Sequence, residues 1–112
     1  MVIQQTGNAN RIVVKVGSST LTYGTGLIHL RRFERLVKVL SDLRNAGKEV
    51  VLVSSGAVSA GAAVLGLGHH PETTEEKQAT AAVGQSELMR MYSEEFSKYG
   101  HTVAQILMTK DV

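Results

Sequence analysis

The 112-residue chain contains no cysteine, no tryptophan and only one proline. The absence of cysteine excludes disulfides, thiolate metal sites and a cysteine nucleophile. It is also typical of proteins kept in a reducing compartment, so we expect a cytoplasmic location. No apolar run approaches the roughly 18 residues that a membrane-spanning helix requires. The first residues also lack the basic and then apolar pattern of a signal peptide.

An excess of charge of one sign is missing as well. Twelve Lys and Arg residues oppose 10 Asp and Glu residues, and the net charge of +2 is too small to indicate a nucleic-acid surface. The first 56 residues nevertheless carry eight basic and three acidic side chains. Two interpretations stay open, an anion-attracting face or the solvated side of an amphipathic helix. Most of this basic excess comes from Arg31, Arg32, Arg35, Lys38, Arg44 and Lys48.

Hydrophobic patterns predict alternating strands and helices. Apolar, β-branched runs predict strands buried on both faces, at residues 11–16, 49–53 and 102–108. Apolar residues spaced three and four apart predict two long helices, at residues 29–46 and 74–98. A run of small residues predicts a short helix at residues 57–66. Because crossovers of this length require parallel neighbours, the expected fold class is α/β with a parallel sheet. Residues 1–10 show no period and are expected to be a loose terminus.

Several residues mark the expected helix boundaries. Thr73, with Glu76 three positions later, predicts a capping box at the start of the last helix. Gly47 and Gly100 predict helix ends. Gly84, inside the last helix, is expected to be a weak point that costs roughly 1 kcal/mol relative to alanine.

The first expected strand ends in a lysine and a glycine turn. Lys15 lies one residue inside the end of the strand, and Gly17 and Ser18 follow it. A charge within an apolar strand is costly unless it reaches a partner, although a lysine can also extend its ammonium group from a strand end into solvent. Backbone N–H groups and hydroxyls in such a turn bind anions. We therefore favour a phosphate-binding role for Lys15, Gly17 and Ser18.

The second expected strand leads into a helix through Ser55, Gly56 and Ala57. The free N–H groups and positive dipole end of a helix N-terminus form an anion site. Plain N-capping by Ser55 is an alternative that does not exclude this role. A P-loop is excluded, because Ala62 and the following alanine stand where that motif requires Lys and Ser or Thr. No histidine has metal-binding spacing to a carboxylate, so no metal site is predicted.

Taken together, these motifs resemble the amino-acid kinase family from about residue 11 to the end of the chain. The resemblance is carried by residues 15–19, 53–61, 77–78, 81–85 and 109–110. It implies a three-layer α/β sandwich with a mainly parallel sheet. It also implies ATP-dependent phosphorylation of the γ-carboxylate of L-glutamate, the first step of proline biosynthesis, with Mg²⁺ as cofactor and a homo-oligomeric assembly.

The resemblance implies a role for each site residue. Lys15 would be catalytic and stabilise the phosphoryl group in transfer, beside the ATP phosphates at Gly17 and Ser18. Ser55 would contact glutamate, and the backbone of Gly56 and Ala57 would face the substrate. A carboxylate nucleophile is already ionised at pH 7, so the reaction needs no general base. Phosphoryl transfer depends mainly on positioning and charge stabilisation, which these groups can supply in part.

The family fold is longer than this chain, and its second half carries the nucleotide site. We therefore expect residues 11–112 to be the N-terminal, amino-acid-binding half of a kinase domain whose nucleotide-binding half is absent, and the isolated chain to be inactive. Two alternatives stay open. The chain can be a truncated, non-catalytic paralogue that binds glutamate or partner subunits, or a kinase of the same family with another substrate.

Overall fold

The sheet of this computed structural model has three strands in the order β1-β2-β3, and the structure describes residues 2–5 and 10–107. β2 (Arg11–Val16) and β3 (Glu49–Ser54) are parallel neighbours, with Lys15 opposite Val53 and Val16 opposite Ser54. The helix α2 (Leu30–Asn45) forms the crossover between them. The strands predicted at residues 11–16 and 49–53, and the α/β class, are confirmed.

The N-terminal segment corrects one prediction. β1 (Val2–Gln5) pairs antiparallel with β2, with Val2 opposite Lys15, so the expectation of a loose terminus is wrong for residues 2–5. Residues 1 and 6–9 lie outside the described part of the chain. The pairing escapes a pattern-based prediction because the backbone groups of a strand edge can pair with any extended segment, whatever its side-chain period.

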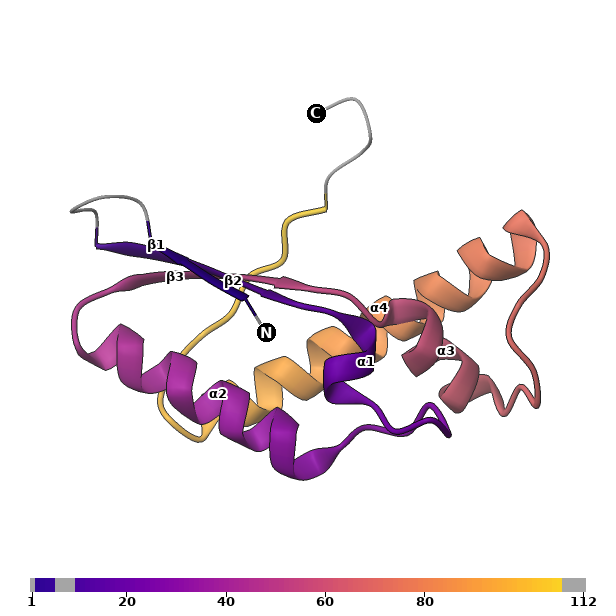
Figure 1. Cartoon of the computed structure of the whole chain (residues 1–112), viewed down its shortest axis with the longest axis horizontal. Helices are drawn as coiled ribbons and strands as arrows, with labels where there is room; N and C mark the ends of the chain where they lie inside the picture. Colours follow the sequence, from indigo (N-terminus) through magenta and orange to yellow (C-terminus); the bar gives the residue numbers. More distant parts are fainter. Residues whose placement is uncertain (1, 6–9, 108–112) are drawn as a thin grey trace.

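The prediction of a third strand at residues 102–108 is wrong for the residues that the structure describes. Residues 102–107 contain no strand, and Met108 lies outside the described chain. Ile106 and Leu107 are 82% and 76% exposed. An apolar, β-branched sequence becomes a strand only where it packs against a neighbour, because β-propensity mainly reflects context. Here the segment leaves the body of the molecule (Figure 1).

The described residues cover the sheet on one face rather than on both, which corrects the predicted burial of the strands. Ile12, Val14 and Val16 of β2 are buried, whereas Val51 and Val53 of β3 are 44% and 46% exposed. Figure 1 shows α2 and α4 (Thr74–Ser97) on the same side of the sheet. A strand with one covered face buries alternate residues.

The basic side chains of α2 lie on its solvated side. Phe33, Leu36, Val37 and Leu40 form its buried face. The basic residues of the helix are exposed, namely Arg31, Arg32, Arg35, Lys38 and Arg44. The solvated-helix interpretation predicts this exposure, and an anion-attracting face would expose the same side chains. Among the described residues, no helix combines the length and hydropathy needed to cross a membrane.

The packing of α3 (Ala57–Leu65) on α4 depends on two glycines. A β-carbon on Gly61 would overlap the carbonyl oxygen of Thr80, and one on Gly84 would overlap the carbonyl oxygen of Ala57. The buried residues of α4 recur every four positions, at Thr80, Gly84, Leu88, Tyr92 and Phe96. Gly84 is thus a required point of close approach, and its description as a weak point of the helix is incomplete.

The start of α4 has a side-chain cap. The Oγ1 atom of Thr73 accepts a hydrogen bond from the N–H of Glu76 at 3.1 Å. The carboxylate of Glu76 accepts from the N–H of Glu72 at 3.2 Å, one residue before the position expected in a capping box. The predicted cap is confirmed, and the reciprocal bond is shifted by one residue.

We expect Thr73→Ala to lower the helix content of a peptide that spans residues 71–99. Loss of the cap leaves the Glu76 N–H without its acceptor and destabilises a peptide helix by about 0.5–1 kcal/mol. Circular dichroism at low temperature measures the effect. Thr74→Ala is the matched control, because Thr74 is the first helical residue and not the cap. Equal helicity of the two variants would contradict the role of Thr73.

Candidate functional site

The structure brings the two predicted anion-binding turns together. Residues 17–18 (the β2 turn) and residues 55–57 (the β3 turn) follow adjacent parallel strands. The N–H of Ser55 donates to the carbonyl oxygen of Val16 at 3.0 Å. A β-carbon built on Gly56 would lie 3.8 Å from both the Cα and the Cβ of Ser18. Figure 1 shows that α1 (Ser18–Leu21) and α3 begin side by side at this end of the sheet.

Lys15 lies on the open face of the sheet. It is exposed, whereas its neighbours Val14 and Val16 are buried on the helix-covered face. Its position opposite Val53 puts it one residue before the last paired position of the ladder, Val16 opposite Ser54. Within the described residues its ammonium group makes no hydrogen bond or ion pair. The exposed interpretation of Lys15 is therefore right about solvent access, and the cation stays available to an anion.

The N-terminus of α3 has no side-chain cap. Its N-cap residue is Gly56, with φ +115, and no side-chain hydrogen bond caps the helix. The alternative interpretation, N-capping by Ser55, is wrong, because Ser55 precedes the N-cap residue by one position. The left-handed backbone conformation of Gly56 is one that glycine adopts without strain. Among the described residues, no side chain accepts a hydrogen bond from the first N–H groups of α3, which favours anion binding.

A contact that sequence reasoning missed fixes the end of β3. The hydroxyl groups of Tyr92 and Ser54 lie 2.8 Å apart and are part-buried. Tyr92 is 5% exposed, and its ring packs near Phe33 and Phe96, with centroid distances of 5.0 and 6.2 Å. Burial raises the pKa of the Tyr92 phenol, and its hydrogen bond with Ser54 offsets part of that rise. In the sequence, Tyr92 is recognisable only as one member of the apolar period of α4.

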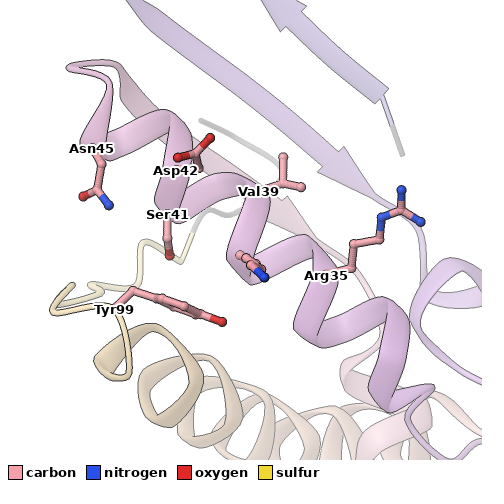
Figure 2. A pocket seen from close by; sticks show the side chains of 7 residues that line it. Arg35, Val39, Ser41, Asp42, Asn45 and Tyr99 are labelled. Atoms are coloured by element: carbon pink, nitrogen blue, oxygen red, sulfur yellow. The ribbon is translucent and has the colours of Figure 1, made fainter.

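Two further features of the described residues add nothing to these turns. Among residues 2–5 and 10–107, no group of three histidines or carboxylates is placed to hold a metal ion. A pocket lies along α2 near Tyr99 (Figure 2), and it includes none of the predicted site residues. Its lining consists of Arg35, Lys38, Val39, Ser41, Asp42, Asn45 and Tyr99.

Comparison with known proteins identifies the relatives of this chain. A model of the amino acid kinase family matches residues 10–112. Proteins named glutamate 5-kinase are similar to most of the chain. The one from Listeria innocua is 57% identical over 105 residues, which are 94% of this chain and 38% of the relative. The one from Clostridium perfringens is 57% identical over 94% of this chain and 39% of the relative.

A third relative extends the comparison. The glutamate 5-kinase of Moorella thermoacetica is 59% identical over 102 residues, which are 91% of this chain and 27% of the relative. The chain thus spans about two-fifths or less of these relatives. The motif residues Thr109 and Lys110 fall within the matched family region but outside the described residues.

Proposed function

Because the chain belongs to the amino acid kinase family, we propose that it is the glutamate-binding part of a kinase that transfers a phosphoryl group from ATP to the γ-carboxylate of L-glutamate. The reaction would open proline biosynthesis. The names of three relatives that are 57–59% identical to the chain support this substrate. The proposal covers the complete enzyme, of which these residues would be one part.

The adjacency of the β2 turn and the β3 turn is the observation that carries the proposal. The reaction brings together two anions, a nucleotide phosphate chain and a carboxylate, and both need N–H donors or cations. In our assignment Gly17 and Ser18 contact the phosphates, and Lys15 stabilises the transferring phosphoryl group. Ser55, Gly56 and Ala57 bind glutamate. The 3.8 Å separation between the Gly56 β-carbon position and Ser18 supports binding of the two anions side by side.

Cofactors and assembly follow from the proposed activity. ATP is the expected phosphoryl donor, and Mg²⁺ would accompany it and neutralise phosphate charge. The described residues do not fit a magnesium site of their own, because they contain no cluster of three candidate ligands and neither turn contains an acidic residue. We assign no step to the ion. A homo-oligomer in the cytoplasm completes the proposal.

The test uses the full-length enzyme, which is the product of the complete gene that encodes these residues. Where that gene stops at Val112, the 105 matched residues are instead exchanged into the Listeria innocua relative. We expect acyl phosphate formation that depends on both L-glutamate and ATP, trapped as the hydroxamate. A folded protein that transfers phosphate only to another acid would contradict the substrate. Glutamate binding without transfer would favour the non-catalytic alternative.

We expect Ser55→Ala in the full-length enzyme to raise the KM for glutamate by about 10-fold, because one hydrogen bond to a charged group is lost. The KM for ATP should change less than twofold. Steady-state kinetics with each substrate varied in turn measures both constants. Ser86→Ala is the control, since Ser86 is exposed on α4. An effect on ATP alone would contradict the assignment of Ser55.

A further inference from the structure

Two contacts join the buried face of α4 to the end of β3 and the β3 turn. Gly84 lies directly against the carbonyl group of Ala57. Two helical turns later, the hydroxyl of Tyr92 lies 2.8 Å from the Oγ atom of Ser54. A single helix therefore contacts the chain on both sides of Gly56, at Ser54 just before the β3 turn and at Ala57 at its end. The contact at Ser54 is polar, and both of its hydroxyl groups are part-buried.

The Ser54 hydroxyl also reaches the peptide group that follows Ser55. Its Oγ atom donates to the carbonyl oxygen of Ser55 at 3.3 Å. When Ser54 donates its proton there, the bond with Tyr92 requires the phenol to donate to Ser54. A tyrosine phenol is protonated at neutral pH, and burial raises the pKa of Tyr92 further, so the phenol can donate. The three groups form a chain from Tyr92 through Ser54 to the Ser55 carbonyl.

The direction of that carbonyl decides the direction of the next N–H. In a trans peptide the C=O and N–H bonds point in opposite directions. The peptide bond between Ser55 and Gly56 carries the Ser55 carbonyl and the Gly56 N–H. When the Ser55 carbonyl points toward the Ser54 hydroxyl, the Gly56 N–H therefore points away from that hydroxyl. Within the described residues that N–H has no hydrogen-bond acceptor.

We propose that Tyr92 is a positioning residue, which acts through Ser54 to hold the peptide between Ser55 and Gly56 so that the Gly56 N–H points at the glutamate carboxylate. This inference rests on the proposed function and adds to it a residue that lies outside both turns. Tyr92 does not touch the substrate in this proposal.

The need for such a restraint follows from Gly56. Glycine occupies positive and negative φ about equally well, so nothing intrinsic to Gly56 prevents rotation of the preceding peptide. A rotated peptide would present the Ser55 carbonyl, an acceptor, where an anion requires a donor. Loss of the restraint should therefore weaken ground-state binding of glutamate, which appears in KM rather than in kcat.

The experiment compares Tyr92→Phe, Ser54→Ala and the double variant in the full-length enzyme. We expect each single variant to raise the KM for glutamate about 3- to 10-fold, which is the range for one neutral hydrogen bond. The kcat and the KM for ATP should stay within twofold of wild type. The glutamate KM of the double variant should be no higher than that of either single variant, because each substitution removes the same chain of hydrogen bonds. Ser54→Thr, which keeps the hydroxyl, should restore the wild-type KM.

Controls separate this inference from the proposed function. Tyr99→Phe removes a phenol that is more exposed and should leave all three constants unchanged. An inactive wild-type enzyme would overturn the proposed function and this inference with it. An active enzyme in which Tyr92→Phe leaves the glutamate KM unchanged, or in which the two substitutions act additively, would overturn the inference alone. If Tyr92→Phe fails to fold, the glutamate KM of Ser54→Ala is compared with that of Ser54→Thr. Equal values for these two variants would overturn the inference.

Discussion

Gly84→Ala is expected to destabilise the protein and to displace the β3 turn. The added β-carbon would overlap the carbonyl oxygen of Ala57, which is backbone and cannot move aside as a flexible side chain could. Overpacking of this kind costs about 1–3 kcal/mol, and more where backbone must shift. Urea unfolding of the full-length enzyme measures the loss of stability. Activity should fall too, because Ala57 belongs to the β3 turn.

The sign of the change in unfolding free energy tests the close packing, because helix propensity alone predicts that Gly84→Ala stabilises the protein. Alanine is about 1 kcal/mol more favourable than glycine within a helix, so a more stable Gly84→Ala variant would contradict the close packing. Gly61→Ala should behave like Gly84→Ala, since its β-carbon would overlap the Thr80 carbonyl. Gly68→Ala is the control, because no atom beyond its two chain neighbours lies within 4 Å of its β-carbon position.

Lys15→Ala is expected to lower kcat by about 100-fold or more, with a much smaller change in the KM for glutamate. Removal of one preorganised charge that stabilises a transition state costs about 100- to 1,000-fold. An interaction made mainly in the transition state appears in kcat. Steady-state kinetics of the full-length enzyme, with hydroxamate trapping of the product, measures both constants.

Folding should be unaffected by Lys15→Ala, because Lys15 is exposed and makes no hydrogen bond or ion pair among the described residues. An unchanged unfolding midpoint would confirm this. Lys38→Ala is the control, since it removes an exposed cation from α2 rather than from the sheet. Unchanged turnover in Lys15→Ala, or equal losses in both variants, would refute the role of Lys15.

The strands β2 and β3 and the helices α2, α3 and α4 follow from local patterns in the sequence. The period of the apolar residues in α2 identifies both the helix and its buried face, because a helix must bury one apolar stripe. The glycine turns at residues 17 and 56 were predictable as well. The parallel order of two strands with a crossover between them brings both turns to one edge of the sheet.

Other features depended on what packs against what. The pairing of β1 and the absence of a strand at residues 102–107 depend on which strand edges are available. The sequence of a short segment does not specify which strand it pairs with. The covered face of the sheet likewise depends on the placement of α2 and α4. Sequence patterns predicted burial on both faces, whereas among the described residues one face of β2 is buried and the same face of β3 is partly buried.

The sequence by itself determined the α/β class, the main elements and the six candidate site residues, because periodicity and turn chemistry are local properties. Only the tertiary structure decided that Gly84 is a contact and not a defect, since its neighbour Ala57 is 27 positions away in the chain. The same holds for Tyr92, whose partner Ser54 is 38 positions away. Contacts between distant residues depend on how the elements pack, and the residue type of Gly84 or Tyr92 does not identify the residue that it contacts.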